Sequence, residues 1–141
     1  MNLRLSCFLI IIALCAELSN GAIFQKDSVH FNNSLQPNNI LKVHCVTKED
    51  DLGDHLLSHG QTYEFSFYES IFKTEVICGL WQGPGFKLYA LLKAYEGAGF
   101  HYGKTNYWDA REDGVYFTHG SLSPKLEYKW KWLAFVLAPT P

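Results

Sequence analysis

The sequence predicts an all-β fold, a small antiparallel β-sandwich of about seven or eight short strands held by one disulfide. Three observations lead to this prediction. Apolar and polar residues alternate with a period of two through most of the chain, aromatic residues make up 16% of it, and glycine-containing turn signals separate the alternating runs. The length of 141 residues is enough for one domain.

The first 21 residues predict a signal peptide, so the mature domain is expected to span residues 22–141. Arg4 supplies a positive charge, and residues 5–16 are almost entirely apolar. This run of about 12 residues is too short for a bilayer, which needs about 20. Ser19 and Gly21 suit the small-residue positions before a cleavage site. The alternative, a buried N-terminal helix, is disfavoured by the terminal position and the preceding arginine.

Charge and hydropathy limit the function classes. A net charge of −2 offers no basic field, so we expect neither a nucleic acid nor an anionic membrane as partner. No second long apolar run follows the signal segment, which predicts a secreted protein without stable membrane insertion. We expect a monomer without a metal or other cofactor.

Alternation also places the strands of the first half of the mature chain. Each run has apolar side chains on one face and polar side chains on the other, which is typical of a half-buried strand. The polar stretch 47–54 is expected to be a loop, and Gly-Pro-Gly at 83–85 a turn. The expected strands are 29–32, 41–45, 63–67, 76–80 and 86–89.

The second half contains a hairpin signal and a final aromatic run. Asp113-Gly114 stands between alternating segments, where glycine adopts positive φ easily, and predicts a hairpin of strands at 108–110 and 115–117. Tyr128, Trp130 and Trp132 alternate with lysines, which predicts a strand with an aromatic face toward the core.

Two segments are less regular. Residues 87–95 are ambiguous, because Leu88, Leu91, Leu92 and Tyr95 also have the spacing of a short helix. Residues 97–103 are glycine-rich and are expected to form a loop.

Four cysteines reduce to two after export. Cys7 and Cys15 lie in the signal peptide, which leaves Cys45 and Cys78. An oxidising compartment permits a disulfide between them, and both fall on the apolar phase of their strands, so the bond would lie inside. Two separate buried thiols are the alternative.

Several of these segments together resemble the plant self-incompatibility S1 family, whose members are also called S-protein homologues. The run LKVHCVTKEDDLG at 41–53 is similar to the family signature, and WDAREDGVY at 108–116 to the family hairpin. Residues 29–35, 63–67, 76–78 and 128–130 are similar to further family strands. The resemblance covers nearly all of the mature chain.

The resemblance implies a secreted plant β-sandwich that works as a binding protein. The founding member is a stigma-secreted ligand that acts on a receptor of incompatible pollen, and no enzymatic activity is attached to the family. Relatives commonly carry two more cysteines, and here Asn106 stands about where one of them would be. Their joint loss suggests that they pair with each other, which leaves Cys45 to pair with Cys78.

Three polar motifs are candidate sites. Asn32-Asn33-Ser34 is an N-glycosylation sequon, with an ordinary polar strand end as the alternative. Glu49, Asp50, Asp51 and Asp54 could suit calcium, but they lack the spacing of an EF-hand, and a solvated turn is the favoured interpretation. His55 and His59 would share a face only on a helix, which disfavours zinc.

An enzyme is the less favoured class. Gly79-Leu80-Trp81 faintly resembles a block of the T2 ribonucleases, but Cys78 stands where that block has its catalytic histidine. No GxSxG nucleophile run occurs. Alternating tryptophans could also stack on sugars, although alternation favours a core role. Trp81, beside the turn at 83–85, is the more plausible exposed aromatic anchor.

The prediction is therefore a non-catalytic extracellular ligand that binds a cell-surface receptor or another extracellular protein through its loops. A secreted hydrolase and a carbohydrate- or cell-wall-binding module are the alternatives. The expected partner-binding residues are Asp50, Asp51, Asp54, Trp81, Arg111, Glu112 and Asp113.

Overall fold

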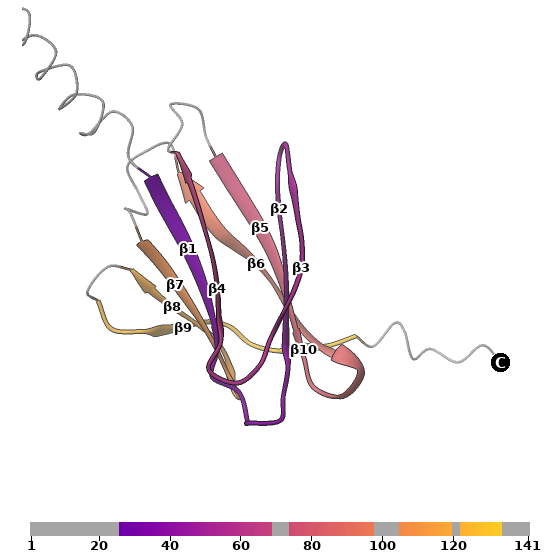
Figure 1. The fold of residues 1–141 in the computed structure, drawn as a ribbon. Helices are drawn as coiled ribbons and strands as arrows, with labels where there is room; N and C mark the ends of the chain where they lie inside the picture. The colour runs from indigo at the N-terminus through magenta and orange to yellow at the C-terminus, as the bar shows by residue number, and fades with distance from the viewer. Residues whose placement is uncertain (1–25, 69–73, 98–104, 120–121, 134–141) are drawn as a thin grey trace, which may run out of the picture.

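Two five-stranded sheets pack face to face (Figure 1). The structure is a computed structural model that describes residues 26–68, 74–97, 105–119 and 122–133. Sheet A has the order β4 (Thr62–Tyr68), β1 (Lys26–Asn33), β7 (Thr105–Arg111), β8 (Gly114–His119), β9 (Lys125–Tyr128). Sheet B has the order β10 (Lys131–Trp132), β6 (Leu88–Gly97), β5 (Thr74–Gln82), β2 (Leu41–Thr47), β3 (Asp51–Leu57).

The all-β sandwich is confirmed, with one departure from a purely antiparallel arrangement. β1 pairs with β7 in parallel, so that Val29 lies opposite Asn106 and Phe31 opposite Trp108. The other strand pairs are antiparallel. A parallel pair needs a long crossover. Here the chain between β1 and β7 forms that crossover, and it contributes β4 to sheet A and β2, β3, β5 and β6 to sheet B.

The core lies between the sheets and follows the predicted alternation. In β1, residues 27, 29, 31 and 33 are buried and the residues between them are half-buried. Phe31, Leu41, Val43 and Leu80 are fully buried, and Tyr63, Phe65 and Phe67 of the edge strand β4 pack against the core with part of their surface exposed. Each fully buried apolar side chain stabilises the fold by about 1.5–3 kcal/mol.

Cys45 and Cys78 form the predicted disulfide. They lie directly opposite each other on β2 and β5, and both are fully buried. The bond therefore links two neighbouring strands of sheet B on their core-facing side, as alternation predicts.

Three predicted elements differ in the structure. The expected loop at 47–54 ends at Asp51, where the edge strand β3 begins. Residues 88–95 of the ambiguous segment belong to the strand β6 and are not a helix, while Phe86 ends a short 3-10 turn (Pro84–Phe86) instead of starting a strand.

The final aromatic run is two strands rather than one. β9 ends at Tyr128 in sheet A, and β10 begins at Lys131 in sheet B, so the chain changes sheets between them. Trp130 donates its indole N–H to the carbonyl oxygen of Arg111 at 2.7 Å, whereas Trp132, on the edge strand β10, is 64% exposed.

The turns lie at one end of the sandwich or the other, according to the direction in which the strands run. The turns at 34–40, 58–61, 83–87 and 112–113 meet at one end of the sandwich, the lower end in Figure 1, whereas the turn at 48–50 lies at the opposite end. The predicted signal peptide and most of the glycine-rich segment 97–103 fall outside the described residues. In the part of the chain that is described, no helix has the length and apolar character that a membrane span requires.

Candidate partner-binding surface

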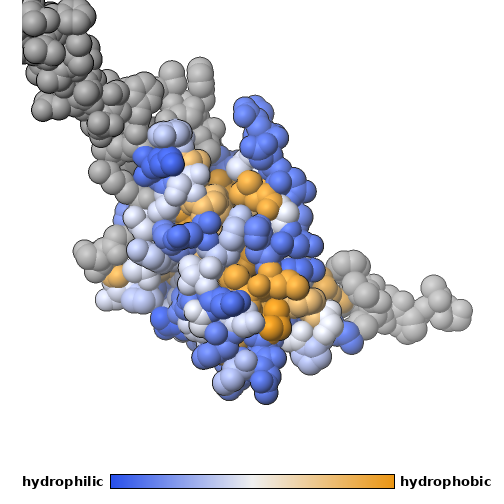
Figure 2. Space-filling view, in the orientation of Figure 1, coloured by the Kyte–Doolittle hydropathy of each residue, from blue (hydrophilic) through white to orange (hydrophobic). Residues whose placement is uncertain are grey.

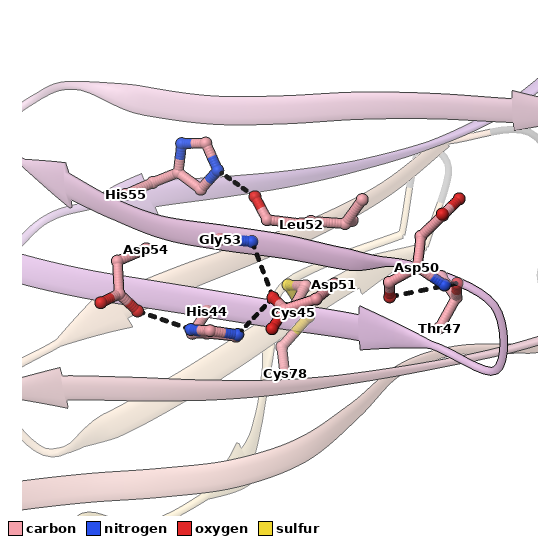
Figure 3. Close-up of polar contacts among 10 residues, drawn as sticks. All are labelled: His44, Cys45, Thr47, Asp50, Asp51, Leu52, Gly53, Asp54, His55 and Cys78. Carbon is pink, nitrogen blue, oxygen red and sulfur yellow. Dashed lines mark hydrogen bonds and ion pairs between the residues drawn. A yellow bond between two sulfur atoms is a disulfide. The ribbon is translucent and has the colours of Figure 1, made fainter.

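His44 of β2 lies between two carboxylates of β3 (Figure 3). Its Nδ1 is 2.5 Å from Asp54 Oδ1, and its Nε2 is 2.6 Å from Asp51 Oδ1. The hydrogen bond with Asp54, and then the interactions with Asp51, raise the pKa of His44 above its usual value. The protonated ring can donate from both nitrogens, which ties the two strands together on their outer face.

The turn at 48–50, beside this cluster, is closed by hydrogen bonds between Thr47 and Asp50. The N–H of Thr47 donates to the carbonyl oxygen of Asp50 at 2.8 Å, and the N–H of Asp50 donates to Thr47 Oγ1 at 2.9 Å (Figure 3). Asp51 accepts from the N–H of Gly53 at 2.9 Å, and this bond, ahead of His44, lowers the pKa of Asp51. Gly53 has a φ of +78°, which glycine adopts without steric conflict.

These contacts give the signature at 41–53 a structural role. Asp51, Asp54 and Gly53 hold the β2–β3 hairpin, while Asp50 is exposed at its tip. His55 and His59 do not converge: the His55 ring contacts the carbonyl oxygen of Leu52, and the His59 ring that of Leu35. Within the described ranges, no three or more His, Cys, Asp or Glu side chains are arranged to hold a metal ion.

The second charged turn, at Arg111–Gly114, lies at the lower end. Arg111 Nε is 2.7 Å from Asp109 Oδ2, and its guanidinium lies 4.2 Å from the centre of the Tyr116 ring. Tyr116 donates its hydroxyl to Asp113 at 2.6 Å, which raises the pKa of Tyr116. These contacts fix the turn, and Glu112 and Asp113 remain exposed on it.

Backbone and amide contacts join the loops of the lower end into one surface. The N–H of Gln36 donates to Glu112 Oε1 at 2.6 Å, which connects the 34–40 loop to the charged turn. Asn39 donates to Gln82 Oε1 at 2.8 Å and accepts from the N–H of Gly83 at 3.0 Å, which connects the same loop to the 83–87 turn. Our sequence analysis did not identify Asn39 as a functional residue.

The side chain of Asn33, at the end of β1, holds the 34–40 loop in place. It is fully buried, donates to the carbonyl oxygens of Asn39 and Leu57 at 2.9 and 2.8 Å, and accepts from the N–H of Leu35 at 2.9 Å. In the sequence, Asn33 was only the middle residue of a sequon. A pair of asparagines at 32–33 followed by a pair at 38–39 was the available signal for a side-chain-bonded loop.

A shallow hollow of about 430 Å³ lies between the 36–40 loop and the turn at 83–86. Amide side chains line one wall, with Ile40 beside them, and Pro84, Gly85 and Phe86 line the other. Ile40 is 38% exposed, and Figure 2 shows hydrophobic surface over the lower half of β2 and β3 within a hydrophilic surround. The lower end therefore offers both apolar and polar contact groups.

Trp81 lies within β5 and not in the adjacent turn, and it is half-buried. The far end of its indole occupies the space above Gly79, where a Cβ would stand 2.3 Å from the ring. Lys42 Nζ lies 4.7 Å from the centre of the indole. The prediction of a loop anchor is wrong on position, because Trp81 lies along the outer face of sheet B.

Asn32 lies near the end of β1 on the outer face of sheet A. Its Nδ2 donates to Ser34 Oγ at 2.8 Å and to Asp109 Oδ1 at 3.1 Å, and its Oδ1 accepts from Thr62. This nitrogen is the atom that a glycan would modify. Glycosylation of Asn32 stays a prediction.

The predicted partner-binding residues thus fall into separate groups. Arg111, Glu112 and Asp113 lie together at the lower end, beside the predicted turn at 83–85 and the loop at 34–40, which the sequence analysis did not select. Asp50 and Asp51 lie at the opposite end, whereas Asp54 and Trp81 lie along sheet B. The predicted residues therefore do not form one contiguous group.

The chain has similar sequences among known proteins. The family described as plant self-incompatibility protein S1 matches residues 28–130. In Arabidopsis thaliana, S-protein homolog 8 is 58% identical over 129 residues, which cover 90% of this chain and 98% of that protein. S-protein homolog 11 from the same plant is 54% identical over 134 residues, which cover 89% and 94%.

A solved structure of SPH (Self-Incompatibility Protein Homologue) proteins has the same fold. It superposes with a TM-score of 0.63 at 23% identity, covering 77% of this chain and 96% of that chain. Those proteins are described as a widespread family of small, highly stable, secreted proteins from plants. This description agrees with the predicted extracellular location.

Proposed function

Because the chain belongs to the plant self-incompatibility protein S1 family, we propose that it acts outside the cell as a ligand. It would bind a cell-surface receptor or another extracellular protein as a monomer, without making or breaking a covalent bond. The lower end of the sandwich is the surface we assign to this partner.

The observation that carries the proposal is the fixed geometry of the lower end. Three loops are joined there by the contacts of Gln36 with Glu112 and of Asn39 with Gly83. A surface that is already ordered loses little conformational entropy when a partner binds. Exposed charges on a rigid β-scaffold are a common arrangement for recognition.

His44, His55 and His59 hold strands and loops together, which agrees with a binding role. His44 lies between two carboxylates of the neighbouring strand. His55 and His59 contact backbone carbonyl oxygens. In these positions the rings hold strands and loops together.

A cell-binding assay tests the proposal. Labelled mature protein, exported and oxidised, is incubated with intact plant cells of several tissues, with excess unlabelled protein as competitor. We expect saturable, competable binding that Asp113→Lys weakens at least tenfold. Glu49→Lys is the matched control, since it makes the same charge reversal at the opposite end.

The two variants separate the ligand role from the assignment of the surface. If only Glu49→Lys weakens binding, the partner uses the other end and the surface assignment is wrong. If no competable binding occurs on any tissue, the ligand proposal is wrong. Hydrolysis of a wall polymer or RNA by the pure protein, at a rate that survives further purification, would also contradict the proposal.

A further inference from the structure

Lys42 is a cation held in place without an acidic partner. Its Nζ lies 4.7 Å from the centre of the Trp81 ring and 5.0 Å from that of Phe86, and no ion pair joins it to a carboxylate among the residues described. Lys93, on the same outer face, contacts Glu75 at 3.0 Å and Glu96 at 2.9 Å. An ammonium group positioned between two rings and left unpaired is suited to an anionic ligand.

A row of four side chains crosses sheet B at this point. Lys42 lies opposite Trp81, Trp81 opposite Tyr89, and Tyr89 opposite Lys131. Residues that lie opposite each other in antiparallel strands point to the same face, so the row presents two rings flanked by two lysines. The strands are roughly 4.8 Å apart, which is close to the length of one pyranose residue in a linear polysaccharide.

The hollow at the lower end adjoins the start of this row. Gln36 and Asn38 line it with amide groups, and Phe86 reaches from it to Lys42. Phe86 has a φ of +54°, a left-handed conformation that is uncommon for a bulky side chain. Strained backbone of this kind is concentrated at ligand-binding sites, where the surrounding structure holds it in place.

We propose that the hollow and the row Lys42–Trp81–Tyr89–Lys131 bind an acidic oligosaccharide, a chain of uronic acid residues. Its carboxylates would pair with Lys42 and Lys131, the apolar faces of its sugar rings would contact the aromatic side chains, and its hydroxyls would bond the amides of Gln36 and Asn38. This inference does not rest on the proposed function, although the hollow also belongs to the lower end that we assign to the protein partner.

A sugar fits this surface better than an acidic peptide does. Extended peptides commonly bind by adding a strand to an exposed sheet edge. The row crosses β2 and β5, whose backbones are paired on both sides, and continues over β6 to the two-residue edge strand β10. Its rings are half-buried along the sheet surface, and the Trp81 indole lies over Gly79 rather than at the wall of a side-chain pocket.

The test titrates the full mature protein with a purified oligogalacturonide by calorimetry at low salt. We expect saturable binding that Lys42→Ala and Trp81→Ala each weaken at least tenfold, with Lys42→Arg retaining most of the affinity. Lys125→Ala and Tyr107→Ala are matched controls on sheet A and should bind as the wild type does. Thermal melting of each variant checks that it folds.

Three comparison ligands test which chemical class of ligand the site binds. The fully methyl-esterified oligomer lacks the carboxylates and should bind at least tenfold more weakly, and a neutral xylan oligomer should do the same. If polyglutamate of equal length binds as tightly, the site recognises acidic peptides and the proposal is wrong. Absence of binding by the wild type, or an equal loss in Lys125→Ala, would also overturn it.

Discussion

His44 makes the stability of the signature hairpin depend on pH. Its two carboxylate partners raise its pKa in the folded state above the unfolded value of about 6.5. The stabilisation is therefore fully present below pH ~6.5 and is lost as the pH rises through the raised pKa. The lowered pKa of Asp51 acts in the opposite direction, because its contribution is lost as the pH falls.

We expect His44→Gln to remove the first of these effects. Chemical denaturation should show a larger loss of unfolding free energy for this variant at pH 5.5 than at pH 8.5. His59→Gln is the control, since its ring contacts a carbonyl oxygen rather than a carboxylate. A His44→Gln penalty that is equal at both pH values would show that the ring acts only by packing.

Two features require glycine at position 114: the conformation of the hairpin turn and the close approach of the neighbouring strand β9. Its φ is positive, as Asp113-Gly114 predicts, and a Cβ there would stand 2.4 Å from the carbonyl oxygen of Tyr128 in β9. We expect Gly114→Ala to lower the unfolding free energy by about 1–3 kcal/mol from this overlap, in addition to backbone strain.

Gly60→Ala separates these two contributions. Gly60 also has a positive φ, of 81°, but nothing lies within 4 Å of an added Cβ. Strain alone should destabilise this variant by about 1 kcal/mol. Equal melting temperatures for the two variants would contradict a role for the close approach of β9.

At the scale of the element, alternation predicts the strands that contribute one face to the core. β1, β2, β4 and β7 each place every second side chain inward, and their sequences show it. β3 was missed because it is an edge strand with a polar outer face, where Asp51 and Asp54 are used by His44. Its composition is that of a loop, and only its pairing with β2 makes it a strand.

The predictions for β6 and for the final aromatic run were inaccurate for related reasons. β6 carries leucine on both faces, and Leu91 is 64% exposed, so its period of two is hidden behind a helix-like spacing. Trp132 has the alternation of Tyr128 and Trp130, but the chain changes sheets before it. A change of sheet is a tertiary event that a local pattern does not record.

The candidate surface was only partly predictable. The hairpin at 111–114 was identified by its turn signal, but its neighbours at 36–40 and 83–87 lie far from it in the sequence. Their contact depends on the parallel pairing of β1 with β7 and on a few side-chain bonds from Asn33 and Asn39. Neither the strand pairing nor these side-chain hydrogen bonds can be recognised from the composition of the sequence or the spacing of its residues.

The loops of the lower end depend on one buried side chain, that of Asn33. Asn33→Ala would leave the carbonyl oxygens of Asn39 and Leu57 and the N–H of Leu35 without their side-chain partner. Each unsatisfied buried group costs about 1–3 kcal/mol, so we expect a loss of about 3 kcal/mol or more in unfolding free energy. The measurement is urea denaturation.

Asn38→Ala is the matched control for that change, since Asn38 is exposed on the same loop. It should alter the unfolding free energy by less than about 0.5 kcal/mol. If the two variants are equally stable, the loops are held by other contacts and the assigned surface is less ordered than we describe.

At the scale of the molecule, the two outer faces differ in chemistry. On sheet A, Asn32, Asp109 and Tyr116 lie in one polar row, which holds the predicted glycan site. On sheet B, the row from Lys42 to Lys131 is cationic and aromatic. A glycan on Asn32 would cover the first face and leave the second face open to the ligand we propose.

The disulfide stabilises the part of the molecule that both proposed sites share. It joins β2 to β5, and the lower ends of these strands carry Lys42, Trp81 and the loops at 36–40 and 83–87. The loop it closes spans a sequence separation of 33 residues, for which the chain-entropy model gives about 3–4 kcal/mol. We expect Cys45→Ala/Cys78→Ala to unfold at correspondingly lower denaturant concentration.

Wild type in strong reductant should approach the stability of the double variant, because both lack the same cross-link. Affinities measured below the unfolding transition should change little, since the bond lies in the core and contacts neither surface directly. Unfolding of the wild type at the same denaturant concentration with and without reductant would contradict the stabilising role. A large loss of affinity in a fully folded double variant would instead show that the bond sets the relative positions of β2 and β5.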